Sequence, residues 1–180
     1  IAGGQNIGDG FKFQIVNKKT EVEFTKFGED EKAKDGKKPL KSVGFYLEKQ
    51  DPDDIHKENQ GYYPLTANME MIKPRKNDAG TTTYYYISKE SGEEVEVNNF
   101  NPEKITDPPV GIYKSDTYGK FKITNLTDGY YRVIEPEAPE YEKGKKYMKV
   151  NGPIKTFKVV DGKVKIYTID KKTEKLIEAE

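Results

Sequence analysis

Apolar and polar residues alternate with a period of two along most of this chain, and no other feature constrains its fold as strongly. Side chains of an extended strand point to opposite faces in turn, so such segments predict strands with one buried face. The segments are residues 11–17, 21–27, 42–49, 81–88, 119–126, 129–135, 154–160 and 162–170. Turn-forming sequences such as NDAG, TDG and VDG separate them, and no segment keeps a helical period. Many short strands with glycine-rich turns predict an all-β protein, an antiparallel β-sandwich.

The composition is that of a folded but highly charged domain. Charged residues make up 34% of the chain, yet 12% of the residues are aromatic and many of these lie in the alternating segments. Because 31 basic residues balance 31 acidic ones, the charge gives no reason to expect nucleic acid or an anionic membrane as a partner. Cysteine is absent, which excludes disulfides, thiol catalysis and cysteine metal sites. No stretch is long and apolar enough to predict membrane insertion.

Residues from about 50 to 115 depart from the alternating pattern. They contain DPDD, KPRKNDAG and NPEKITDPP and are too numerous for a plain loop, so we expect an elaborated insertion with extra strands. The acidic run at 51–61 has room for a helical turn. Its DPDD stretch (51–54) lacks the alternating ligand spacing and the glycine of a calcium loop, so we expect a solvated turn and no metal. His56, the only histidine, lies in this polar run and is expected to have no catalytic or metal-binding role.

A short internal sequence repeat suggests that the chain contains a module of a tandem array. FQIVNKKTE (13–21) and YTIDKKTEK (167–175) share an aromatic-x-Ile-x-Asn/Asp-Lys-Lys-Thr-Glu pattern, and each follows an Asp-Gly turn. The spacing is that of a domain rather than of a short solenoid repeat. The simplest interpretation makes residues 1–19 the tail strand of a preceding module, 20–172 one domain and 173–180 a linker to the next module. A chance match is the alternative.

Three ionisable residues stand where the alternation predicts core residues. The rows are Val22–Phe24–Lys26, Tyr131–Val133–Glu135 and Val164–Ile166–Thr168–Asp170. Because isolated charges in a core are costly, we expect Lys26, Glu135 and Asp170 to lie together. One interpretation is a buried ion network without a covalent bond. The other is a Lys–Asp isopeptide bond, since burial favours neutral amines and carboxylic acids and a neighbouring glutamic acid can relay the proton to the departing water. Alternation alone does not separate the two.

Three segments resemble a known family. EVEFTK (21–26), KPLKSVGFYLEK (38–49) and YGKFKITNLTDGYYRVIEPEAPEY (118–141) are similar to the B-type repeats of collagen adhesin (Cna B-type) and to related Gram-positive pilin domains. The third segment resembles the E-box of pilins, and the residues that fit it are Tyr131, Glu135, Ala138, Pro139 and Tyr141. The chain departs from the pattern at Pro136, where a threonine is usual, in lacking a glycine before the last tyrosine, and in having Asp rather than Asn at 170.

The resemblance covers roughly residues 20–172 and implies an immunoglobulin-like, prealbumin-like β-sandwich. It implies that Lys26 is the nucleophile, Asp170 the acceptor and Glu135 the proton relay of a self-formed isopeptide bond, with Asn17 the acceptor of the preceding module. Such a domain needs no cofactor and is not a turnover enzyme. It implies a structural stalk or spacer in an extracellular protein attached to the bacterial cell wall, with neighbouring modules of the same chain as partners.

An alternative function is adhesion through the insertion. Its tyrosines are Tyr62, Tyr63, Tyr84, Tyr85 and Tyr86. They are expected either to pair across strands as sheet packing or to form a surface for a ligand in the host extracellular matrix or on the cell surface, a protein or a glycan.

Overall fold

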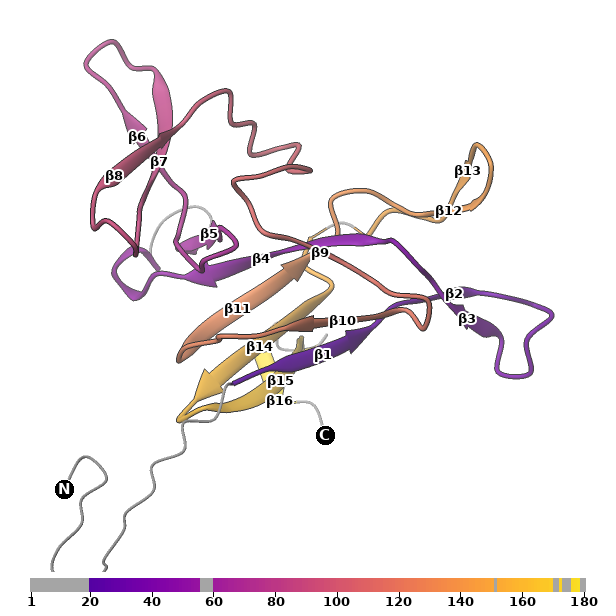
Figure 1. Cartoon of the computed structure of the whole chain (residues 1–180). Helices are drawn as coiled ribbons and strands as arrows, with labels where there is room; N and C mark the ends of the chain where they lie inside the picture. The colour runs from indigo at the N-terminus through magenta and orange to yellow at the C-terminus, as the bar shows by residue number, and fades with distance from the viewer. Residues whose placement is uncertain (1–19, 56–59, 151, 170–171, 173–175, 179–180) are drawn as a thin grey trace, which may run out of the picture.

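The computed structural model describes residues 20–55, 60–150, 152–169, 172 and 176–178, and within these residues the protein is all-β (Figure 1). The paired strands run antiparallel, as predicted. The predicted strand at 11–17, with Asn17, lies outside the described residues, as do His56 and Asp170.

One large sheet forms the main layer. Its strand order is β16-β15-β14-β11-β4-β5, and β9 also pairs with β4. The bounds are β4 (Gly44–Gln50), β5 (Tyr62–Pro64), β9 (Ile112–Lys114), β11 (Gly129–Ile134), β14 (Lys155–Val160), β15 (Lys163–Ile169) and β16 (Leu176–Glu178). The strands predicted over 42–49, 129–135, 154–160 and 162–170 therefore all belong to this layer.

A second, smaller layer faces the large sheet. It consists of β1 (Val22–Thr25) and β10 (Lys120–Ile123), which pair with each other (Figure 1). Aromatic rings fill the space between the layers: Phe121 stacks on Phe45 with 4.3 Å between ring centroids, and Phe24 lies 5.8 Å from Phe157. The two layers and their shared core are consistent with the predicted β-sandwich.

The alternation correctly identifies the buried faces. Tyr131 and Val133 are fully buried, and Val22 and Phe24 are less than 10% exposed. The Tyr131 hydroxyl donates to the carbonyl oxygen of Thr127 (2.6 Å) and accepts from its amide (3.2 Å). This tyrosine corner fixes the start of β11 to the connection from β10, an arrangement found in β-sandwiches with Greek-key connections.

The region between β4 and β9 has structure of its own, as the sequence predicts for the insertion. It contains the 3-10 helix η1 (Pro52–Asp54) and a three-stranded sheet of β6 (Lys73–Lys76), β7 (Thr82–Ile87) and β8 (Glu94–Val97). Its own small core consists of Ile72, Val97, Ile105 and Val110. Both β5 and β9 pair with β4, so the insertion leaves and rejoins the large sheet along one strand.

Two short hairpins complete the described strands. They are β2 (Phe27–Glu29) with β3 (Lys37–Pro39), and β12 (Glu140–Glu142) with β13 (Lys145–Lys146). Among the described residues, no helix has the length and apolar character required to span a membrane.

Candidate functional site

Lys26 lies at the junction of β1 and β2. Its amide donates to the Gly119 carbonyl (2.7 Å), and its own carbonyl accepts from the Leu40 amide (2.9 Å). The strand predicted over 21–27 is thus divided at Lys26, because the backbone exchanges its partner β10 for β3. The inward row of Val22 and Phe24 still continues to Lys26, whose side chain is only 21% exposed.

Glu135 follows β11 directly and continues the inward row of Tyr131 and Val133. Its side chain is 1% exposed, and its Oε2 lies 3.0 Å from Nζ of Lys26. The two residues come from opposite layers of the sandwich. The structure therefore brings together two of the three ionisable residues that the sequence predicts to meet.

The Lys26–Glu135 contact leaves the carboxyl group under-bonded. The two groups are close enough for an ion pair but are not aligned for a hydrogen bond, and neither Glu135 oxygen accepts a hydrogen bond from any described residue. A buried carboxyl group without hydrogen bonds is costly and calls for a specific explanation. Within the described part of the chain, this group has unused hydrogen-bonding capacity next to an amine.

The strand that leads to Asp170 starts beside the strand that leads to Lys26. The Thr20 hydroxyl, just before β1, donates to the Gly162 carbonyl, just before β15 (3.2 Å). Farther along, Phe24 of β1 lies 5.8 Å from Phe157, which pairs with Ile166 of β15. The two strands therefore run in the same direction, one in each layer. β15 ends at Ile169, the residue before Asp170.

The five tyrosines of the predicted ligand surface all have contacts within the protein. Tyr62 and Tyr63 are only 4% exposed. Tyr84 and Tyr86 pack against the core of the insertion, and Tyr85 lies on the other side of β7, 4.0 Å from the guanidinium of an arginine on β6. The contacts fit sheet packing, and ligand binding by these tyrosines stays a prediction.

A second buried ion pair was not predicted from the sequence. The Lys73 ammonium, on β6, donates to the Asp51 carboxylate, just after β4, and lies 3.8 Å from an oxygen of Asp54. Asp51 is 8% exposed and caps η1, so the predicted solvated turn is wrong for this residue. The hydrogen bond from Lys73 lowers the pKa of Asp51. The described residues contain no group of three side chains suited to a metal ion. The contact between Asp51 and Lys73 instead connects the insertion to the end of β4.

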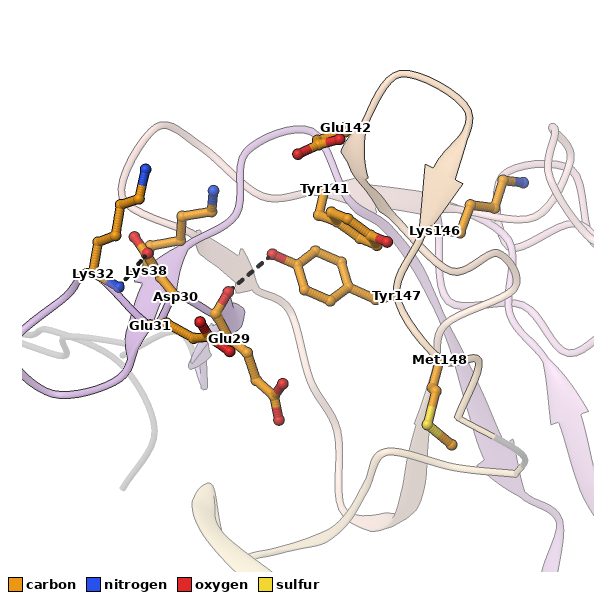
Figure 2. A pocket seen from close by; sticks show the side chains of 10 residues that line it. All are labelled: Glu29, Asp30, Glu31, Lys32, Lys38, Tyr141, Glu142, Lys146, Tyr147 and Met148. Carbon is orange, nitrogen blue, oxygen red and sulfur yellow. Dashed lines mark hydrogen bonds between the residues drawn. The ribbon is translucent and has the colours of Figure 1, made fainter.

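A cleft of about 750 Å³ opens between the β2–β3 and β12–β13 hairpins (Figure 2). The Tyr147 hydroxyl spans it to the Glu29 carbonyl (3.4 Å), and Tyr141 packs edge-on against Tyr147 with 5.3 Å between centroids. Lys146 points away from the space between the hairpins. The lining residues are Glu29, Asp30, Glu31, Lys32, Lys38, Tyr141, Glu142, Lys146, Tyr147 and Met148. The cleft holds neither Lys26 nor Glu135, and its mixed charges select no single ligand class.

Comparison with known proteins finds no matching family model, no matching curated protein and no matching solved structure. The function is therefore inferred from the geometry of the sandwich and from the contact between Lys26 and Glu135.

Proposed function

We propose that this chain is a structural stalk domain of an extracellular, wall-attached Gram-positive protein, closed by an isopeptide bond between Lys26 and Asp170. The observation that carries the proposal is the 3.0 Å approach of the Lys26 amine to a buried Glu135 carboxyl group that accepts no hydrogen bond from the described residues. An ordinary buried ion pair normally satisfies its carboxylate with hydrogen bonds. The arrangement is better suited to a carboxyl group that assists a reaction.

The register of the large sheet supports Asp170 as the acceptor. Tyr131 is opposite Phe157, and Phe157 is opposite Ile166. The inward row of β11 therefore lies two strands from the inward row of β15. The first row leads to Glu135 and the second leads toward position 170, while Lys26 approaches from the opposite layer.

The proposed reaction needs only these three side chains. The neutral Lys26 amine attacks the carboxyl carbon of Asp170, a C–N bond forms, and the C–OH bond breaks. Glu135, in its neutral form, donates a hydrogen bond to the acceptor and relays the amine proton to the departing hydroxyl, which leaves as water. The carboxyl of Glu135 is regenerated. The products are one amide and one water, without a cofactor and without further turnover.

Two features support the immunoglobulin-like, Cna B-type interpretation of the sandwich. The first is the tyrosine corner at Tyr131, which immunoglobulin-like sandwiches also contain. The second is that this tyrosine and Glu135 belong to the segment that resembles the E-box, whose inward row leads to Lys26. In this proposal the tyrosine fixes the start of β11, and the candidate relay Glu135 follows the end of that strand.

A bond between β1 and the end of β15 suits a load-bearing module. The bond would connect strands near the two ends of the domain, so pulling on the termini would load an amide rather than a ladder of hydrogen bonds. Closing a loop of this size would also restrict the unfolded chain, by about 5 kcal/mol if the relation for disulfides applies. In a chain without cysteine, the amide would provide the covalent stabilisation that disulfides give to other extracellular domains.

The intact mass of the purified protein tests this proposal. We expect the wild-type chain to be one water lighter than its sequence, and the Glu135→Ala and Lys26→Arg variants to have the full sequence mass. The arginine keeps the positive charge at 26 but is not a nucleophilic amine. Peptide mapping of the wild type should recover a branched peptide that joins residues 26 and 170.

Lys73→Arg is the matched control, since Lys73 also contacts a buried aspartate. Asp51 and Lys73 both favour their charged forms, because the Lys73 hydrogen bond lowers the pKa of Asp51 and the Asp51 carboxylate raises that of Lys73 against the opposing effect of burial. This variant should keep the mass deficit. Full sequence mass in the wild type would reject the isopeptide proposal and leave Lys26 and Glu135 as an ion pair.

A further inference from the structure

The outer face of the large sheet, turned away from β1 and β10, has an unusual set of side chains. The register places Tyr130 opposite Lys158, and Lys158 opposite Lys165. In the next row, Arg132 is opposite Thr156, which is opposite Tyr167. Because the inward residues of β11, β14 and β15 pack in the core, these rows point outward.

This outer face carries more basic than acidic residues, in a chain with no net charge. The outward positions of β4, β11, β14 and β15 include one carboxylate, Glu48, and four basic residues, and the edge strand β16 adds Glu178 opposite Tyr167. Glu48 is directly opposite Arg132. The basic residues are Arg132, Lys158, Lys163 and Lys165. Such an imbalance on one face favours anionic partners.

Aromatic rings lie among these cations. The Lys158 ammonium is 4.8 Å from the centroid of the Tyr130 ring, and the Tyr130 and Tyr167 rings are 6.4 Å apart. Both tyrosines are only half-buried. Tyrosine and arginine are enriched in binding surfaces because they combine large contact areas with polar groups. We call this surface the cationic face; it consists of Tyr130, Arg132, Lys158, Lys163, Lys165 and Tyr167.

The position of the cationic face limits the kind of partner. β11 and β14 are each paired on both sides, so their backbone groups are unavailable to an added peptide strand. What the face offers is a set of point charges and tyrosine rings. Pyranose rings stack their CH-rich faces on aromatic rings, and carboxylate or sulfate groups pair with ammonium and guanidinium groups. A charged sugar polymer uses both kinds of contact at once.

We propose that the cationic face binds an anionic polysaccharide. Its carboxylate or sulfate groups pair with the basic residues, and its sugar rings pack on Tyr130 and Tyr167. This surface meets the insertion at Arg132, whose guanidinium lies 3.6 Å from the centroid of the Tyr62 ring. It does not depend on the isopeptide bond.

Titration of the wild-type chain with a heparin oligosaccharide, followed by calorimetry at two salt concentrations, tests the proposal. We expect saturable binding that weakens with salt. The double variant Lys158→Gln/Lys163→Gln should bind about two- to thirtyfold more weakly, because two charge pairs are lost. The matched control is Lys120→Gln/Lys122→Gln on β10, where both lysines are 50% exposed and each lies near a glutamate of β1. It should bind as wild type does.

A second variant and a second probe separate recognition of sugar from simple charge attraction. Tyr130→Leu keeps every charge and should still weaken heparin binding several-fold. Poly-L-glutamate should bind much more weakly than heparin at equal charge concentration. The proposal is overturned if heparin does not bind, if the β10 variant loses as much affinity as the β14–β15 variant, or if poly-L-glutamate binds as tightly as heparin.

Discussion

At the scale of single residues, the protein buries carboxyl groups in two different ways. Asp51 receives hydrogen bonds from Lys73 and from the backbone of η1, which compensate for its lost hydration. Glu135 is more deeply buried and receives none from the described residues. The first arrangement is that of a structural ion pair, whereas the second is compatible with the role proposed for Glu135.

The structural pair predicts a pH dependence of stability. Because the folded-state pKa of Asp51 is lowered, its contribution to the free energy of unfolding is present at neutral pH and is lost as the pH falls through the range below about 4. We expect Asp51→Asn to cost about 1–3 kcal/mol at pH 7 and progressively less as the pH falls. Urea denaturation from pH 7 to about pH 3 measures this.

Asp53→Asn is the matched control, on the same 3-10 helix but with an exposed side chain. It should change the free energy of unfolding little at any pH. A constant difference between Asp51→Asn and wild type across the whole pH range would show that the Lys73 contact does not depend on the charge of Asp51.

At the scale of elements, the period-two pattern identified the strands that bury one face against the core, such as β1, β10 and β11. It missed β2, β3, β12 and β13 because their side chains are largely exposed on both faces and show no apolar alternation. The same pattern predicted Lys26 and Glu135, since both continue inward rows. The Asp51–Lys73 pair could not be predicted this way, because it depends on how the insertion folds back on β4.

The junction of β1 and β2 depends on one glycine. Gly119 has φ +76°, and a Cβ added there would lie 2.4 Å from the Lys26 carbonyl oxygen. We expect Gly119→Ala to lower the free energy of unfolding by about 2–4 kcal/mol, from backbone strain and from displacement of Lys26. Displacement should also leave part of the protein without the proposed amide, which intact mass detects.

Gly144→Ala isolates the contribution of backbone strain. Gly144, between β12 and β13, has φ +78° but no atom within 4 Å of an added Cβ. This variant should lose only about 1 kcal/mol. If the two alanine variants lose equal stability in urea denaturation, the close approach of Gly119 to Lys26 adds nothing to the free energy of unfolding.

At the scale of the whole molecule, the proposed bond would make a closed covalent ring of residues 26 to 170, and the insertion lies within that ring. A single backbone cut in the insertion would therefore leave the chain in one piece, even after unfolding. A disulfide between the first and last strands of a sandwich would have the same effect, but a reductant would open it.

This ring is testable with a protease recognition sequence placed at Gly92, in the turn between β7 and β8. After cleavage and denaturation in reductant, the wild-type chain should migrate as one species. The same chain with Lys26→Arg should separate into two fragments. Separation of the cleaved wild type would mean that no covalent bond joins the parts on either side of the cut.

The pairing of both β5 and β9 with β4 affects how the sequence of such a chain can evolve. Because the polypeptide departs from and comes back to the same strand, everything between these two points can lengthen, shorten or be replaced while the sandwich keeps its register. Loop-closure entropy grows only slowly with length, so the thermodynamic penalty of such exchange is small. The insertion can thus accept new sequences with little loss of stability in the rest of the domain.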